Sequence, residues 1–200
     1  PCWFVRELEQ AEHYIYIEYF IINDGVMWRT ILDILERKAT EGVDVRLIYD
    51  GFGCLTTLPY HYERFLREKG IQCQVFNPFR PLLNIVQNNR DHRKICVIDG
   101  KTGFTGGINL ADEYINQKRR FGHWKDTAVI LKGEAVWNMT VMFLHMWNVI
   151  ANSSEPIDHE LHLPHHFHPD SFESDGYVQP YSDTPLDGEI VGEKCLPQHH

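Results

Sequence analysis

The chain has 200 residues, of which 43% are hydrophobic and 12% aromatic, and its formal net charge is -9 at pH 7. This length and apolar content favour one domain with a sizeable core, with room for an appendage. The acidic balance argues against a general nucleic-acid-binding protein, which normally presents a basic face. The spacing of the five cysteines shows no metal-ligand pairing and indicates a reducing compartment.

The first part of the chain alternates helical and strand-like patterns. Apolar residues recur at helical spacing in three segments, and three others are rich in aromatic and β-branched residues. Because the connections between them are short, the series predicts a parallel α/β unit. The expected elements are helices over 3–12, 27–38 and 58–69 and strands over 13–22, 43–49 and 71–76.

The next part of the chain predicts three more strands and a long helix. A buried strand follows His92, and the Asp99-Gly100 turn connects it to a partner over 102–105. Another strand is expected over 124–132, and a helix over 134–151. Polar residues interrupt that helix, so we expect it to pack against the core and not to span a membrane. Any membrane anchor is expected to lie outside this chain.

The composition changes after residue 152. We expect a catalytic domain over 1–153, a polar loop or linker rich in His and Pro over 154–176, and the start of a truncated second half over 177–200. One more strand is expected over 177–181. The linker contains five histidines, which suggests metal binding, but its Pro and acidic residues favour a mobile loop. We therefore expect no metal site there, and no cofactor.

The stretch from Asn89 to Gly100 is where we expect the chemistry. His92 and Lys94 share one face of the predicted strand, because side chains alternate along a strand. Imidazole can act as a nucleophile or an acid near neutral pH, and an ammonium group can hold a phosphate oxygen. A few residues later, Gly106 and Gly107 allow the backbone to approach a ligand, and Asn109 supplies a carboxamide.

The motif region is locally positive on an acidic chain. From Phe76 to Lys132 there are ten Lys and Arg residues against five Asp and Glu residues. This excess suits an anionic head group or an anionic membrane surface, although ordinary surface charge would produce it too.

The motifs resemble those of the phospholipase D superfamily: His-x-Lys-x-x-x-x-Asp over 92–99, then Gly-Gly-x-Asn over 106–109. The flanking sequences, over 91–114 and 122–127, are similar to the first catalytic half of bacterial cardiolipin synthases. The resemblance covers about residues 10 to 150 and implies an α/β/α sandwich with a mixed central sheet. The chain departs from the family pattern because it contains no second copy of the first motif.

The resemblance also implies roles for individual residues. His92 is the nucleophile or its acid/base partner, and Lys94 and Asn109, with Gly106 and Gly107, bind the phosphoryl oxygens. Asp99 belongs to the motif, but its opposite parity to Lys94 indicates a structural role. A carboxylate should hold the second ring nitrogen of the histidine, with Asp126 as the first choice and Glu113 as the second.

The implied function is phosphatidyl transfer between two phosphatidylglycerol molecules, which forms cardiolipin through a phosphohistidine. The implied partners are this phospholipid, the membrane surface and a second catalytic half or homodimer partner, with no nucleic acid. The implied location is the cytoplasmic side of the cell membrane. Two alternatives remain open: a single-motif phosphodiesterase or nuclease completed by homodimerisation, and a catalytically incomplete binding half.

Overall fold

The computed structural model describes residues 2–79, 90–120, 122–153, 156–158, 162 and 177–182. Within these residues, six strands form one sheet in the order β3-β2-β1-β4-β5-β6. The strands are β1 (Tyr14–Tyr19), β2 (Asp44–Asp50), β3 (Gln72–Phe76), β4 (Lys94–Ile98), β5 (Thr102–Gly106) and β6 (Ala128–Lys132). The helices are α1 (Cys2–Glu9), α2 (Val26–Thr40), α3 (Tyr62–Glu68) and α4 (Val136–Ala151).

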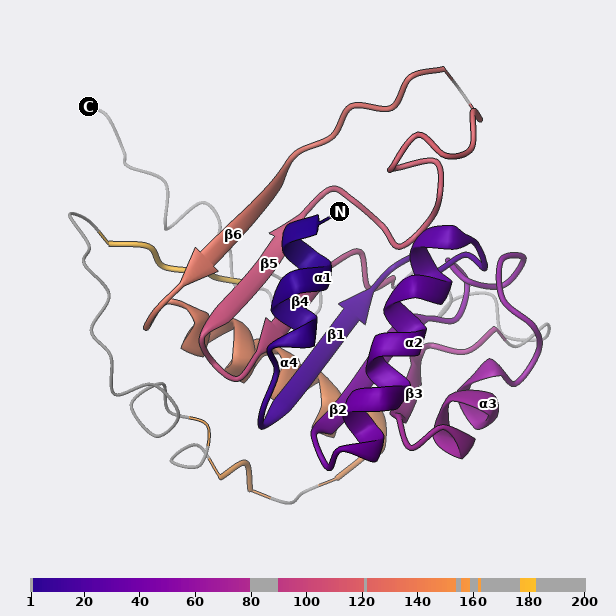
Figure 1. Cartoon of the computed structure of the whole chain (residues 1–200). Helices are drawn as coiled ribbons and strands as arrows, with labels where there is room; N and C mark the ends of the chain where they lie inside the picture. The colour runs from indigo at the N-terminus through magenta and orange to yellow at the C-terminus, as the bar shows by residue number, and fades with distance from the viewer. Residues whose placement is uncertain are drawn as a thin grey trace, which may run out of the picture.

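The sheet is mixed. Strands β1, β2 and β3 are parallel, as the alternating helix and strand patterns predict, whereas β4 is antiparallel to β1. Strands β5 and β6 continue in antiparallel pairs. Helices α1, α2 and α3 cover one face, and α4 covers the other (Figure 1). The predicted α/β/α sandwich with a mixed central sheet is therefore confirmed.

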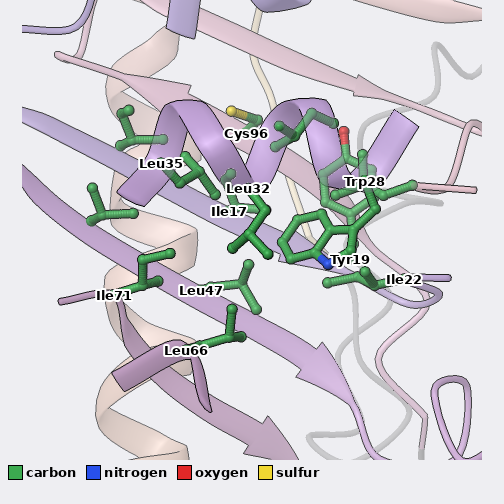
Figure 2. Packing of buried hydrophobic residues seen from close by; sticks show 14 of the residues in the cluster. Ile17, Tyr19, Ile22, Trp28, Leu32, Leu35, Leu47, Leu66, Ile71 and Cys96 are labelled. Carbon is green, nitrogen blue, oxygen red and sulfur yellow. The ribbon is translucent and has the colours of Figure 1, made fainter. Parts of the chain in front are cut away.

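Alternation along the strands divides the core into two clusters. Cys96 and Ile98 of β4 face α1 and α2, in the cluster that contains Trp28 and Leu35. Figure 2 shows part of this cluster, with the Trp28 ring among the aliphatic side chains of α2 and the strands. Ile95 and Val97 of β4 face α4 in the second cluster. All five residues of β4 are buried, as expected for a strand covered on both faces.

Asp99 and Gly100 form the turn between β4 and β5. Both have positive φ angles, 51° and 62°, as a type I′ hairpin turn requires. The Asp99 carboxylate accepts hydrogen bonds of 2.8 Å from the backbone N–H groups of Glu12, His13 and Tyr14. The side chain thereby anchors the start of β1 to the β4–β5 turn.

Several predicted elements differ from the structure in their bounds, and one is missing. The helix expected from residue 58 begins at Tyr62, after His61 with a φ of 60°. The strand expected from residue 124 begins at Ala128, because the preceding residues form contacts with a loop and not with a strand. The segment 177–182 contains no strand, so the strand expected there is wrong.

Most of the His-rich segment lies outside the described residues. His162 is described, and both its ring nitrogens are engaged, with the Tyr16 hydroxyl at 3.1 Å and the Asp158 carbonyl oxygen at 2.9 Å. The described ranges contain no group of three or more His, Cys, Asp or Glu side chains arranged to hold a metal ion. None of the helices in the described part of the chain combines the length and apolar character needed to cross a bilayer.

Candidate active site

His92 lies at the edge of the sheet where several strands end. Because β4 runs antiparallel to β1, its first residue, Lys94, pairs with Tyr19 at the carboxyl end of β1. The carboxyl ends of β2 and β3 lie at the same edge, and so does the end of β5, where Thr105 pairs with Ile95. Ligands in α/β proteins commonly bind at the carboxyl ends of strands.

The side chains of His92 and Lys94 contact each other. Lys94 Nζ lies 3.1 Å from Nδ1 of His92 and 2.6 Å from its carbonyl oxygen. Since an ammonium group only donates, Nδ1 is the acceptor, and a neutral His92 carries its hydrogen on Nε2. The Phe20 ring packs beside both side chains, with its centroid 4.3 Å from that of His92 and 5.4 Å from Lys94 Nζ. An exposed imidazole is thus held against a buried ammonium group.

The surroundings lower the pKa values of both groups. Partial loss of hydration holds the pKa of His92 below its ordinary value, and the positive charge of Lys94 lowers it further. Burial lowers the pKa of Lys94, while the carboxylates of Asp91 and Asp126 oppose that shift. His92 is therefore neutral near pH 7, as a nucleophile or general base must be.

Gly106 and Gly107 bring the end of β5 close to the start of β6. Gly106 has a φ of 148°, and a Cβ there would lie 2.4 Å from the carbonyl oxygen of Thr127. A Cβ on Gly107 would lie 2.2 Å from Oδ1 of Asp126. The two glycines thus make room for the backbone of β6 and for the Asp126 carboxylate.

The structure relates one of the two candidate carboxylates, Asp126, to the site. Asp126 accepts hydrogen bonds from Nε1 of Trp124 at 3.3 Å and from the backbone N–H of Thr127 at 2.7 Å. Its charge acts on Lys94. Glu113 is buried, and its Oε1 lies 3.4 Å from Arg120. The hydrogen bonds of Asp126 in the described part of the chain do not include His92, so its role as holder of the ring stays a prediction.

Asn109 is buried beside the segment that carries Phe20. Its Oδ1 accepts a hydrogen bond of 3.1 Å from the backbone N–H of Ile21, and its Nδ2 donates one of 2.7 Å to the Tyr114 hydroxyl. Among the described residues, these contacts leave one hydrogen of Nδ2 for a ligand, because a carboxamide has two. The role of Asn109 in holding a phosphoryl oxygen stays a prediction. Asp99, in contrast, lies at the opposite end of β4 from His92.

Sequence reasoning missed a buried ionic cluster behind His92. Arg93 Nη2 lies 2.5 Å from Glu18 Oε1, and Arg93 Nε lies 3.1 Å from Asp91 Oδ1. Burial raises the pKa of Glu18 well above its ordinary value, and the Asp91 carboxylate adds to the shift. The signal in the sequence is a glutamate inside an otherwise apolar strand. Since Asp91 and Arg93 flank His92, the cluster fixes the backbone from which the imidazole projects.

A buried aspartate from a neighbouring strand holds the same backbone. Oδ2 of Asp50, at the end of β2, accepts a hydrogen bond of 3.1 Å from the backbone N–H of Asp91. Oδ1 of Asp50 accepts hydrogen bonds from the backbone N–H groups of Phe52 and Gly53, at 2.9 and 2.8 Å. Asp50 therefore ties the loop after β2 to the residue that precedes His92.

A cavity of about 350 Å³ opens beside His92 and extends between the sheet and α4. Its lining consists of the first residues of the β4 segment, the end of β5, two methionines of α4 and three residues near the end of the described chain. These are His92, Arg93, Lys94, Ile95, Thr105, Gly106, Met139, Met142, Gln179, Pro180 and Tyr181.

Comparison with known proteins agrees with this site. Residues 4–147 match the family described as "Cardiolipin synthase, PLD-like domain", where PLD stands for phospholipase D. The chain belongs to this family. The match contains the whole sheet and the His92 motif, so the sequence resemblance to the phospholipase D superfamily is confirmed.

The similar sequences include named cardiolipin synthases. The chain is 40% identical to cardiolipin synthase 2 of Staphylococcus epidermidis over 145 residues, which are 72% of this chain and 30% of that protein. It is 35% identical to a cardiolipin synthase of Listeria innocua over 82% of this chain and 34% of that protein. An uncharacterized protein of Streptococcus mutans is 52% identical over 94% of this chain and 40% of its own length. The chain thus spans well under half the length of these curated relatives.

Two solved structures share the fold at low sequence identity. NucT from Helicobacter pylori matches with a TM-score of 0.55 and 14% identity, over 74% of this chain and 86% of that chain. Phosphatidylserine synthase from Haemophilus influenzae matches with a TM-score of 0.55 and 16% identity, over 70% of this chain and 33% of that chain. At these identities the likeness establishes the fold and not the substrate.

Proposed function

We propose that this chain is the first catalytic half of a phosphatidyltransferase that converts two phosphatidylglycerol molecules into cardiolipin and glycerol. The observation that carries the proposal is the contact between His92 and Lys94 at the edge of the sheet. The matched residues that form this sheet belong to the cardiolipin synthase family. A phosphodiester requires a nucleophile, a proton donor on the opposite side and cations for the remaining oxygens. His92 and Lys94 provide an imidazole and an ammonium group for these roles.

In the proposed reaction, a histidine nitrogen attacks phosphorus and forms an N–P bond, while the bond from phosphorus to the glycerol oxygen breaks. A second histidine gives its proton to that oxygen and releases glycerol. The same histidine then takes the proton from a hydroxyl group of a second phosphatidylglycerol, whose oxygen attacks phosphorus and breaks the N–P bond. His92 takes one of these two roles, and a second half supplies the other histidine.

Lys94 couples substrate binding to the state of His92. The ammonium group now donates to Nδ1 of His92, and a bound phosphate would compete for the same hydrogens. When Lys94 turns to a non-bridging oxygen, Nδ1 becomes available to a carboxylate. Asp126 is the candidate for this carboxylate, because its negative charge raises the pKa of Lys94. Asn109 adds a second donor for the phosphoryl oxygens, next to the backbone of Gly106 and Gly107.

The length of the relatives supports a two-part site. The matched segments are 30% to 40% of those proteins, which leaves room for a second half in each of them. The proposed place of action is the cytoplasmic face of the cell membrane, where phosphatidylglycerol lies. The locally basic region around the motif would support contact with anionic head groups.

Two other functions use the same residues. A homodimer would bring two copies of His92 together and complete a single-motif phosphodiesterase or nuclease. The net charge of -9 counts against a nucleic-acid substrate. Alternatively, the chain would act as a binding half without chemistry. Plasmid cleavage that depends on His92 would favour the nuclease.

A chimeric enzyme tests the proposal. This chain would replace the matched segment of the Staphylococcus epidermidis cardiolipin synthase 2, and conversion of phosphatidylglycerol to cardiolipin would be measured in mixed micelles. We expect cardiolipin from the parent chimera and a loss of at least about a hundredfold in both His92→Ala and Lys94→Ala. The matched controls, His13→Ala and Lys101→Ala, change exposed residues at the opposite end of the sheet and should retain activity.

Undiminished cardiolipin formation by His92→Ala in a folded chimera would overturn the proposal. Activity of the chain without any second half, lost on dilution below its dimerisation range, would favour the homodimer.

A further inference from the structure

The ring of Phe20 contacts both side chains that the first motif supplies. Its centroid lies 4.3 Å from that of the His92 ring, and the two ring planes are tilted by 39°. The ammonium nitrogen of Lys94 lies over the same ring, 5.4 Å from its centroid. An ammonium group at this distance is attracted by the electron-rich face of an aromatic ring. The Phe20 ring is therefore a common wall for the imidazole and the ammonium group.

This wall restricts a side chain that would otherwise rotate freely. His92 is exposed, and an exposed side chain keeps more rotamer freedom than a buried one. Nδ1 of His92 can stay 3.1 Å from Lys94 Nζ only while the imidazole keeps one orientation. Attack on phosphorus, or proton transfer to its leaving group, also requires one orientation of the ring. The stacked Phe20 ring and the hydrogen bond from Lys94 favour the same orientation.

The segment that carries Phe20 also contacts the second motif. The backbone N–H of Ile21 donates a hydrogen bond of 3.1 Å to Oδ1 of Asn109. The carbonyl oxygen of Ile21 accepts one of 3.1 Å from the N–H of Leu110, and Ile22 forms an isolated parallel bridge with Leu110. The same short segment thus fixes the Asn109 carboxamide relative to the imidazole of His92.

The loop after β2 holds this segment from the other side. A Cβ on Gly53 would lie 2.2 Å from the carbonyl oxygen of Phe20 and 2.9 Å from Cε2 of its ring, so the loop approaches closely only because residue 53 is a glycine. Sγ of Cys54 accepts a hydrogen bond from the N–H of Ile22 and donates one to the carbonyl oxygen of Phe20. The hydroxyl of Thr57 donates to the carbonyl oxygen of Ile22 at 2.6 Å.

We propose that Phe20 is a positioning residue, whose ring aims the imidazole of His92 at the phosphate and keeps the Lys94 ammonium group beside it. The inference rests on the proposed function, in which His92, Lys94 and Asn109 must reach one phosphodiester. Phe20 has no proton to exchange, so it acts only through these neighbours. Loss of the ring should therefore slow the chemical steps, and should affect substrate binding much less.

The coupling between Lys94 and His92 gives a readout that does not depend on turnover. The charge of Lys94 lowers the pKa of His92, whereas the carboxylates of Asp50 and Asp91 raise it. The change in this pKa on Lys94→Met, followed by NMR of the histidine ring, measures the coupling. In a Phe20→Leu background the change should shrink by about half, because the imidazole is no longer held against the ammonium group.

Phe65 provides a matched control on α3. Its ring also lies near an ammonium group, with Lys69 Nζ 5.0 Å from the ring centroid, and it also contacts a second ring, that of Tyr62, at 5.2 Å. Phe65→Leu should leave the coupling between Lys94 and His92 unchanged. Urea unfolding would establish that Phe20→Leu and Phe65→Leu are folded under the conditions of the titration.

The chimera supplies the second readout. In Phe20→Leu we expect kcat for cardiolipin formation to fall about tenfold, with KM within about twofold of the parental value. Phe20→Tyr keeps the ring and should recover most of the lost turnover. Gly53→Ala displaces Phe20 without a change in any motif residue, so it should lower kcat in the same direction. Phe65→Leu should keep the parental kcat.

The two readouts separate this inference from the proposed function. If the parent chimera is active and Phe20→Leu matches Phe65→Leu in both coupling and kcat, the positioning role is wrong and the proposed function stands. A rise in KM at constant kcat would also overturn the positioning role, because it would assign Phe20 to substrate binding. If the parent chimera forms no cardiolipin, the proposed function fails, and the coupling measured in the chain still decides whether Phe20 positions His92.

Discussion

The ammonium nitrogen of Lys94 lies 3.1 Å from Nδ1 of His92, so the two motif residues form a donor–acceptor pair. The pair gives the imidazole a defined tautomer and keeps a positive charge beside it. A phosphate that binds to Lys94 therefore changes the electrostatic environment of the histidine. This coupling has consequences for the pH dependence of the site.

Replacing Lys94 should raise the pKa of His92. The Lys94 charge lowers that pKa, so Lys94→Met removes a cause of the shift and moves the value back toward 6.5. Titration of the His92 ring by NMR would measure the change, with Lys101→Met as the control at an exposed site. An unchanged or lower pKa of His92 in Lys94→Met would contradict the coupling.

The lowered pKa of His92 also makes the free energy of unfolding depend on pH. Because the pKa of folded His92 is below 6.5, the unfolded chain takes up this proton first as the pH falls. The contribution of His92 therefore opposes folding at pH values below about 6.5 and vanishes above it. Comparing the pH dependence of urea unfolding in the parent and in His92→Gln would isolate this contribution.

Replacing Arg93 should lower the free energy of unfolding, because two carboxylates buried behind the site lose their cation. Arg93→Met leaves Glu18 and Asp91 without their common cation, which should cost on the order of 3 kcal/mol of unfolding free energy at pH 8. Glu18→Gln should restore much of this loss in the double variant. Urea unfolding gives these values, and the exposed pair of Arg29 and Asp24 supplies the control, because Arg29→Met should cost less than about 1 kcal/mol.

The stability that Arg93→Met loses should depend on pH. The pKa of Glu18 is raised in the folded chain, so the folded chain binds this proton before the unfolded chain does as the pH falls toward 4.5. The destabilisation should therefore shrink between pH 8 and pH 5. A loss that stays constant over this range would show that Glu18 is not the group left uncompensated.

The two glycines after β5 should respond differently to alanine. At Gly106, a Cβ meets the backbone of Thr127 and Ala128 and the φ of 148° is unfavourable, so Gly106→Ala should cost about 3 kcal/mol of stability. At Gly107, a Cβ meets the side-chain carboxylate of Asp126, which can rotate away. We expect Gly107→Ala to retain most of its stability but to lose activity in the chimera. Equal losses of stability would argue against this distinction.

Asp99 should act on stability and not on chemistry. Asp99→Ala removes the acceptor of three backbone N–H groups, and we expect a loss of about 3 kcal/mol. Asp99→Asn keeps one acceptor oxygen and the positive φ, so its loss should be smaller. Thermal unfolding measures both, and turnover per folded chimera should remain near the parental value. A large drop in turnover for stable Asp99→Asn would assign the carboxylate a role at the site.

The sequence predicts most of the sheet and the position of His92. The alternation along β4 correctly assigns Cys96 and Ile95 to opposite faces, and the Asp99-Gly100 turn correctly predicts the β4–β5 hairpin. These features are local, since they depend on the period of the strand and on positive φ angles at one turn. The resemblance of the motif to the family then suggests the chemistry that we propose.

Contacts between distant residues could not be predicted in this way. The partner of Glu18 is Arg93, which directly precedes β4, a strand that only the folded sheet brings next to β1. In the same way, the Asp112 carboxylate accepts hydrogen bonds from the backbone N–H groups of Val26 and Met27, at 3.0 and 2.8 Å. Asp112 thereby caps the start of α2 from a loop that is distant in the sequence. Neither pairing leaves a periodic signal in the sequence.

Chemical rescue at position 92 would test the central claim most directly. In the chimera, His92→Gly removes the imidazole and leaves space beside Phe20 and Lys94. We predict that cardiolipin formation is lost in His92→Gly and partly restored by free imidazole, in proportion to its neutral form, whereas His13→Gly is active and unaffected by imidazole. Full activity of His92→Gly without imidazole would contradict the account.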